Sequence, residues 1–526
     1  MGKAGVGQDS SALTSAKPNA AAGFVAHVRR PAMLLAGLAA ITLFHFFVFP
    51  GHSWLAAQTD VPDTKLYLPM IERLASPGFL SRDLVATHPT VAYTVYDEAT
   101  LFVRKLLRTD FRRSLAVQQL AFRFAAVTGV FLLARAARLN RPLSLVAALL
   151  ANFGSWVPGV GVALSDPDPA PYAFALCAVL LGAGFLASGR PLSAGFAAGI
   201  GLLYDLRIAA PFWIIVILAA IISRSSRRLM RASFPVFIVF VLLLGNIAQL
   251  QPGVTEPQML WGRIPPAIAM IRRFRSPQLW IGSWHWPAFA ACFLVAGFCA
   301  WGVLRLWPRL DEAARWMFAG LPLAGFLSFP LSFVLLDLMR AEAIPLLQPA
   351  VLLLLPLAFC AIACTVAGLH SLRERRWREV ALLFAVVALL PLISPARPQQ
   401  RDTGNLSNWA LANTWGASMF LFPDAGRASD PAVFRAQSKR AVWVDWDTGK
   451  LADASESFAD EWFRRWQDTM AGDYSTSRLA RLLSLPIDYY VLQRSHAVPG
   501  VRPVFMDNQY VVYDANDLKT ALRTLH

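Results

Sequence analysis

Three acidic residues lie in residues 51–113, directly after the first apolar stretch of the chain. They are Asp60, Asp63 and Asp83, and His88 follows Asp83 by five positions. A carboxylate at a membrane surface could remove a proton from an acceptor hydroxyl or amine, because its surroundings can raise its pKa toward a useful value. The alternative is structural: Asp63 would cap a helix, and Asp60 and Asp83 would be solvated loop acids.

A second pair of acids, Asp166 and Asp168, lies in the run Ser165-Asp166-Pro167-Asp168-Pro169-Ala170-Pro171-Tyr172. Alternating prolines favour an extended turn, which presents both carboxylates at the mouth of an apolar stretch. Two carboxylates in this arrangement could hold a divalent cation or supply a second group for proton transfer. The alternative is a rigid proline turn that only begins the next helix.

Several arginines interrupt loops that otherwise carry acids and prolines: Arg207 beside Asp205, Arg263, the run Arg272-Arg273-Phe274-Arg275, and Arg340. Guanidinium groups bind phosphate through two parallel hydrogen bonds. Residues 251–285 mix these arginines with tryptophan and isoleucine, a composition suited to the level of lipid headgroups. These arginines therefore predict a site for a lipid-linked phosphate, and simple anchoring to anionic lipids is the alternative.

Arg123 follows Gln118 and Gln119 inside an apolar stretch. An arginine in hydrocarbon is costly, so Arg123 should face a partner or a polar cavity, which we expect to open to the outside.

The bulk composition places the chain in a membrane. Of its 526 residues, 56% are hydrophobic and 16% are charged, which is too apolar for a soluble protein of this length. The net charge of +16 arises mostly from arginines in short loops between apolar stretches, so it indicates membrane topology and no nucleic-acid partner.

A membrane-crossing helix needs about 18 to 22 apolar residues. The sequence predicts a polytopic α-helical membrane protein of about eleven such helices. The expected spans are 32–50, 114–135, 142–164, 170–188, 191–205, 208–223, 233–250, 286–304, 316–336, 343–368 and 378–394. The fifth and sixth are short, and they could be two tilted spans or one broken pair.

The arginine-rich turns alternate with the acidic turns along the chain. Under the positive-inside rule, this pattern predicts a cytoplasmic N-terminus and extracytoplasmic loops at 51–113 and 251–285. An odd number of spans then places the C-terminal region outside. The long first loop contains two stretches with helical spacing, 63–74, which includes Tyr67, and 93–107, and both are expected to lie in the membrane interface.

The chain divides into three parts by composition: a flexible cytoplasmic leader at 1–31, a transmembrane domain at 32–394, and a small α/β domain at 395–526. In the last part, 441–446, 489–492 and 510–513 alternate as strands do, and 460–470 and 477–485 favour helices. Its tryptophans could form the core or a surface for saccharides. All five cysteines lie in apolar stretches and predict packing without disulfides.

The predicted layout resembles the GT-C superfamily of membrane glycosyltransferases. It consists of one span, a long outward loop containing the stretch Asp63, Tyr67 and Ile71, many further spans and an exported C-terminal domain. The C-terminal stretch Asn408-Trp409-Ala410-Leu411-Ala412-Asn413-Thr414 is similar to a domain found in bacterial proteins of this kind. The chain departs from the superfamily in one respect: Asp60 and Asp63 are three positions apart, whereas some members have an adjacent acidic pair.

The resemblance implies roles for particular residues. Asp60 or Asp63 would be the catalytic acid of the first loop, and Asp166 or Asp168 would be a second acid. Arg207, Arg263 and Arg340 would hold the polyprenyl phosphate.

The sequence therefore predicts a glycosyltransferase of the bacterial inner membrane that moves a sugar from a polyprenyl-phosphate donor to a lipid, glycan or protein acceptor in the periplasm. No cofactor is expected beyond a divalent cation at Asp166 and Asp168. The substrate-binding set also includes Tyr67, Arg123, Asp83 and His88. The alternatives are a transporter or flippase of a lipid-linked substrate and a non-catalytic protein of envelope assembly. Internal sequence repeats would favour the transporter, and the sequence shows none.

Overall fold

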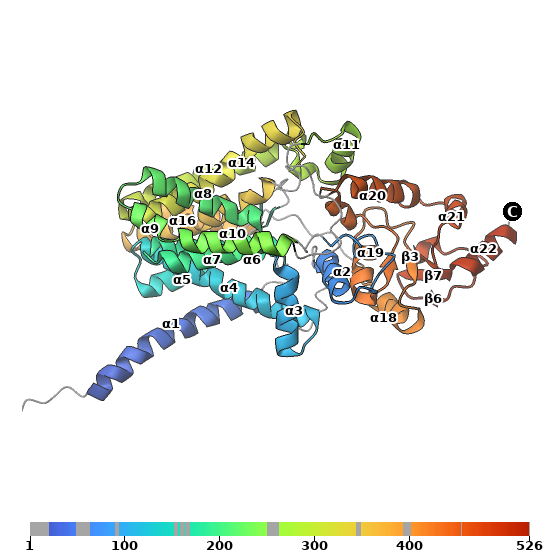
Figure 1. Cartoon of the computed structure of the whole chain (residues 1–526), viewed down its shortest axis with the longest axis horizontal. Coiled ribbons are helices and arrows are strands. Elements are labelled where there is room, and N and C mark those ends of the chain that lie inside the picture. Colours follow the sequence, from blue (N-terminus) through green and yellow to red (C-terminus); the bar gives the residue numbers. More distant parts are fainter. Residues whose placement is uncertain are drawn as a thin grey trace, which may run out of the picture.

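The computed structural model describes residues 20–48, 64–89, 94–151, 156–157, 162–163, 169–249, 262–342, 349–392, 401–453 and 455–524. A bundle of helices occupies one side of the molecule, and an α/β region formed by residues 401–524 occupies the other (Figure 1). Helices α2 and α11, which belong to the two long loops, lie between the bundle and this C-terminal region (Figure 1).

Each apolar range expected to cross the membrane contains a helix. The helices of the bundle are α1 (Ala20–Val48), α4 (Phe111–Ala136), α5 (Arg141–Ala151), α6 (Pro171–Ala187), α7 (Pro191–Tyr204), α8 (Leu206–Ile222), α9 (Arg227–Arg231), α10 (Phe234–Gln249), α12 (Trp286–Leu306), α13 (Glu312–Arg315), α14 (Leu321–Ser332), α16 (Leu354–Arg373) and α17 (Trp377–Leu392). The loop helices are α2 (Thr64–Ala75), α3 (Tyr96–Leu107) and α11 (Pro266–Arg275).

Five helical segments in the described part of the chain are long and apolar enough to cross a membrane: Phe111–Ala136, Arg227–Ile247, Trp286–Arg309, Glu312–Leu338 and Val351–Arg373. The other apolar helices are shorter, and α7 has 14 residues. The structure therefore shows a mostly helical membrane protein, and the number of eleven crossings stays a prediction.

The expectation of one helix over 142–164 was wrong. Helix α5 ends at Ala151, and two short strands, β1 (Trp156–Val157) and β2 (Val162–Ala163), pair antiparallel after it. The intervening sequence contains Gly154, Pro158 and Gly159, which disfavour a continuous helix. An interruption of this kind is tolerated at membrane depth where protein surrounds it.

The fifth and sixth ranges form two helices that break at one residue. Asp205 has extended backbone angles, and its side chain accepts a hydrogen bond from the backbone N–H of Arg207 at 2.9 Å, which caps α8. The carboxylate of Asp205 therefore marks a sharp change of direction between α7 and α8.

Small residues let the helices of the bundle approach closely. A Cβ atom at Gly129 in α4 would lie 2.5 Å from the backbone carbonyl of Leu180 in α6. Only glycine fits there, as is common where membrane helices cross.

The C-terminal region is built on a five-stranded mixed sheet in the order β4-β3-β5-β7-β6. The strands are β3 (Met419–Leu421), β4 (Ala441–Val442), β5 (Tyr489–Gln493), β6 (Phe505–Met506) and β7 (Tyr510–Asp514). The helices are α18 (Gly404–Asn413), α19 (Asp430–Ser438), the 3-10 helix η9 (Asp447–Asp453), α20 (Glu456–Thr469), α21 (Thr476–Leu482) and α22 (Ala515–Thr524). The strands expected at 489–492 and 510–513 and the two expected helices are present, whereas the strand expected over 441–446 is limited to Ala441–Val442.

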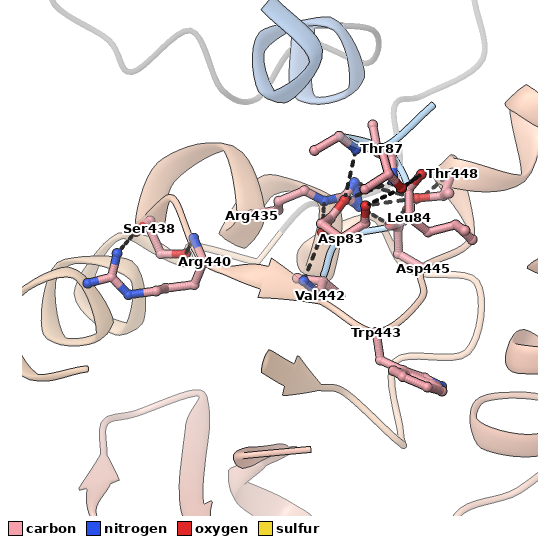
Figure 2. A network of polar contacts seen from close by, with 12 residues as sticks. Asp83, Leu84, Thr87, Arg435, Ser438, Arg440, Val442, Trp443, Asp445 and Thr448 are labelled. Carbon is pink, nitrogen blue, oxygen red and sulfur yellow. Dashed lines mark hydrogen bonds and ion pairs between the residues drawn. The ribbon is translucent and has the colours of Figure 1, made fainter. Parts of the chain in front are cut away.

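A buried triad joins the first loop to the C-terminal region. The Arg435 guanidinium lies between the carboxylates of Asp83 and Asp445, and all three side chains are at most 1% exposed (Figure 2). Oδ2 of Asp83, which accepts the Arg435 Nε at 3.0 Å, also accepts the backbone N–H of Val442 at 2.9 Å (Figure 2). Burial alone would lower the pKa of Arg435, but the two carboxylates outweigh it and raise the pKa.

Further contacts extend this junction along both loops. Lys65 in α2 pairs with Asp447 at 2.5 Å, and Glu72 pairs with Lys439 at 2.9 Å. From α11, the Arg272 Nε donates to the carbonyl of Ala452 at 2.8 Å. The C-terminal region is thus held by α2 and α11 together.

The α11 arginines do not lie at a lipid surface as a group. Arg272 is fully buried, and Arg275 donates from its Nε to the Trp446 carbonyl and lies 4.7 Å from the Trp446 ring. Trp446 packs with Phe274 and Trp466, so these aromatics form the junction and not a saccharide surface. The expectation of a headgroup site for Arg272 and Arg275 is therefore corrected.

We predict that Arg435→Met destabilises the C-terminal region, because it leaves two buried carboxylates without their cation. The expected cost is roughly 3–5 kcal/mol, typical of a broken buried ion pair. Thermal unfolding of the purified protein, followed by tryptophan fluorescence, should show a lower midpoint. The control is Arg464→Met, which removes a mostly exposed partner of Glu461 and should change little. Equal midpoints for the two variants would contradict a structural role for the triad.

Candidate functional site

Aromatic side chains from five helices meet where the first loop joins the bundle. Tyr67 in α2 and Tyr96 in α3 have ring centroids 5.7 Å apart, and Tyr96 also contacts Phe174 in α6 and Tyr204 in α7. Phe122 in α4 stacks on Phe174 at 4.6 Å. These residues form what we call the five-ring cluster, which fixes the first loop against α4, α6 and α7.

Hydrogen bonds lock α3 and α4 onto the cluster. The Tyr204 hydroxyl donates to Oε1 of Gln118, and Nε2 of Gln118 donates to the Thr100 hydroxyl, both at 3.0 Å. The backbone N–H of Val95 donates to the Leu203 carbonyl at 3.0 Å. Gln118, which the sequence showed only as a polar residue in an apolar stretch, is thus a buried link between three elements.

The Tyr96 hydroxyl reaches the turn before α6, where it donates to the carbonyl of Pro169. Pro169 directly follows Asp168 in the chain. The first loop and the proline-rich turn are therefore joined at this point.

The break between α7 and α8 places a cation beside the cluster. The Arg207 Nε lies 2.9 Å from Oδ1 and 3.1 Å from Oδ2 of Asp205, and its Nη2 also contacts Oδ2. The side chain of Asp205 is 3% exposed and that of Arg207 is 22% exposed. The buried carboxylate thus orients a guanidinium whose side chain is only partly exposed.

Two tyrosines lie within electrostatic range of this guanidinium. They are Tyr67 of the first loop and Tyr172, the second residue of α6. Tyr67 and Arg207, two residues selected from the sequence, therefore lie in the same neighbourhood, together with Tyr172, which the sequence presented only as the end of the proline run.

Arg123 lies half-buried in α4, inside the bundle. Its charge interacts with His45 in α1 and Cys177 in α6. This placement gives the arginine protein surroundings, as a charge at this depth requires.

A short antiparallel bridge pairs Arg263 with Ala341, the residue after Arg340, so the backbones at the two arginines are neighbours. The Ile264 N–H donates to the Arg340 carbonyl at 2.8 Å, and the Glu342 N–H donates to the Gly262 carbonyl at 3.0 Å. Arg263 is exposed and Arg340 is half-buried. The pairing of these two loops could not be read from the sequence.

Asp83 and His88 have structural surroundings. Asp83 is committed to Arg435, Val442 and the backbone of its own turn, and the ring of His88 packs on Phe458 of the C-terminal region at 5.1 Å. These contacts assign both residues to the junction, and we withdraw them from the substrate-binding set.

The four predicted catalytic acids, Asp60, Asp63, Asp166 and Asp168, lie outside the described residues. Their chain neighbours are placed: Thr64, the first residue of α2, is buried, and Pro169 accepts the Tyr96 hydroxyl. In the part of the chain that the structure describes, no group of three His, Cys, Asp or Glu side chains is arranged to hold a metal.

Asp97 is a carboxyl group that the sequence reasoning missed. It lies in the first turn of α3 beside Tyr96, is 4% exposed, and its Oδ1 has no hydrogen-bond partner among the described residues. Burial, a hydrogen bond with Glu98 and the charge of Glu98 raise the pKa of Asp97 to about 8. The signal available in the sequence was the adjacent acidic pair Asp97-Glu98 within the first loop.

The raised pKa of Asp97 predicts a pH-dependent stability. Folding raises this pKa from 3.8 to about 8, so between these values the folded protein binds more protons than the unfolded chain. The stabilisation from Asp97 is therefore complete below about pH 4 and lost as the pH rises through about 8.

Asp97→Asn should remove this dependence, because the amide does not ionise. The unfolding midpoint of the wild type should fall more steeply between acidic and mildly alkaline pH than that of the variant. The variant retains the other titrating groups, such as Asp453 with its pKa near 7, so the difference between the two proteins isolates Asp97. Parallel pH profiles would show that Asp97 does not titrate in this range.

No protein-family model and no curated protein matches this chain. Among solved structures, it is similar to ArnT from Cupriavidus metallidurans, in the apo state and bound to undecaprenyl phosphate. In each case the identity is 11%, the match covers 94% of this chain and 98% of the other, and the TM-score is 0.39.

Proposed function

We propose that this protein is an integral membrane glycosyltransferase that moves a sugar from a polyprenyl-phosphate donor to a lipid, glycan or protein acceptor at the periplasmic face. The observation that carries the proposal is the Arg207 guanidinium, which Asp205 orients at the break between α7 and α8, with Tyr67 and Tyr172 within electrostatic range. These residues come from the first loop, the start of α6 and the start of α8, which are the elements expected to bear the chemistry.

Arg207 suits the phosphate of a lipid-linked donor. When the bond between the sugar and the phosphate breaks, negative charge develops on the phosphate oxygens. A guanidinium held in place before the reaction stabilises that charge without having to reorganise. The contacts with Asp205 at 2.9 and 3.1 Å provide this orientation.

Two of the proposed catalytic acids are close in sequence to described residues of the site. Asp63 precedes Thr64, and Tyr67 lies one turn further along α2, while Asp168 precedes Pro169. Tyr67 belongs to the five-ring cluster, and the Pro169 carbonyl accepts the Tyr96 hydroxyl, so described residues close in sequence to both acids adjoin that cluster. We assign Asp60 or Asp63 as the base that takes the acceptor proton as the acceptor attacks the sugar. Asp166 and Asp168 would assist or hold a divalent cation.

The outer surface of α3 supports access for a lipid. Phe102 and Leu106 are 65% and 66% exposed, and Leu107 is 48% exposed. Arg104 and Lys105 lie among them, an arrangement that suits a helix in the membrane interface. A donor with a long apolar tail would meet the cluster from this side.

The proposal predicts that Arg207→Gln and Asp63→Asn abolish one glycan modification in a complemented deletion strain, with normal protein abundance. Loss of one oriented charge donor should slow transfer by about 10²–10³-fold. Mass spectrometry of surface glycans gives the readout. Arg113→Gln is the matched control, because Arg113 lies at the start of α4 with its side chain 72% exposed. Unchanged glycans in both test variants would argue against an enzyme at this site.

A detergent assay separates transfer from transport. Lipid extract of the deletion strain should contain the unconsumed donor and acceptor. Purified wild-type protein in detergent should release polyprenyl phosphate from this extract, which a flippase cannot do once no bilayer separates two compartments. Loss of the glycan in cells without any donor consumption in detergent would favour the transporter.

A further inference from the structure

An ordered chain of ion pairs lies at the end of the bundle remote from the C-terminal region. Helix α12 starts next to the loop of α11, and its 21 residues carry the chain about 30 Å away from that loop. There, Arg305 pairs with Glu379, and Arg309 pairs with Glu374. Arg376 joins the two carboxylates, at 3.2 Å from Glu374 and 3.5 Å from Glu379.

These groups surround a small polar cavity of about 50 Å³, lined by Arg305, Arg309, His370, Ser371, Glu374 and Arg376. Three guanidinium groups share two carboxylates, so one positive charge is left over. Ser371 donates to Glu379 at 2.9 Å, which fixes the carboxylate behind the cavity. We call this set of residues the basic ring.

Further exposed arginines lie next to the ring in the chain. Arg373, Arg375 and Arg378 are exposed, and no described acid other than those of the ring lies in the turn between α16 and α17. Trp307 and Trp377 are 40% and 64% exposed beside it. Exposed tryptophan and arginine at helix ends are typical of the level of lipid headgroups.

An apolar surface continues from the ring along the helices. Leu304 in α12 is 68% exposed, Leu382 in α17 is 49% exposed, and Leu372 in α16 is 37% exposed. A free anion would use the charges alone, whereas a lipid would use the charges and this apolar surface together.

We propose that the basic ring and the adjacent Arg375 bind the headgroup of an anionic phospholipid in the leaflet opposite the candidate site. The phosphodiester accepts hydrogen bonds from the arginines, and an acyl chain lies along the exposed leucines. The carboxylates hold the guanidinium groups in fixed positions, so this is a defined site and not a general property of a basic surface.

The test uses the full-length protein in detergent, with bound lipid measured by native mass spectrometry during titration with cardiolipin or phosphatidylcholine. The double variant Arg375→Gln, Arg376→Gln removes two cations but leaves Glu374 with Arg309 and Glu379 with Arg305. Each arginine contributes about fivefold to anionic lipid binding, so cardiolipin affinity should fall roughly 30-fold.

The matched control is Arg224→Gln, Arg228→Gln, which removes two exposed arginines from the turn between α8 and α10, also at this end of the bundle (Figure 1). It should keep wild-type affinity, and phosphatidylcholine should bind weakly to all three proteins. Equal losses in both double variants would overturn the proposal in favour of general surface charge. Displacement of cardiolipin by millimolar inorganic phosphate would overturn it in favour of a simple anion site.

Discussion

The placement of the first loop depends on the burial of Arg435 between Asp83 and Asp445. Each partner is at most 1% exposed, so none can lose its counter-charge without leaving an ion in a medium that solvates it poorly. Asp83 belongs to the turn that follows α2, and Arg435 belongs to α19 of the C-terminal region. This triad converts a long loop after the first apolar helix into a fixed platform, and α2 presents Tyr67 from that platform to Arg207.

The C-terminal region therefore acts first as a scaffold. It forms ion pairs with Lys65 and Glu72 of α2 and accepts hydrogen bonds from Arg272 and Arg275 of α11. Both long loops are therefore ordered by the same partner. Its buried tryptophans, such as Trp462, belong to this packing and are not available to bind a saccharide. In the proposed enzyme, the reacting groups would lie in the loops and at helix ends, and the C-terminal region would hold these segments in fixed positions.

Much of the helical layout could be predicted because apolar runs bounded by arginines have a direct physical meaning in a membrane. The strands β5 and β7 were also predictable from alternation. Contacts between distant segments could not be predicted. Asp83 and Arg435 are 352 positions apart, and nothing in the local sequence shows that one neutralises the other. Arg272 and Arg275 were assigned to lipid headgroups for the same reason. Asp97 was missed because only burial distinguishes it from an ordinary loop acid.

In the proposed enzyme, Arg207, oriented by Asp205, and Tyr67, presented by the first loop, would face one phosphate. The most direct measurement is a cryo-electron microscopy structure of the protein with bound polyprenyl phosphate. We expect phosphate density within hydrogen-bonding distance of the Arg207 guanidinium, beside Tyr67 and Tyr172. Phosphate density remote from the break between α7 and α8, with the Asp205 and Arg207 pair unchanged, would contradict it.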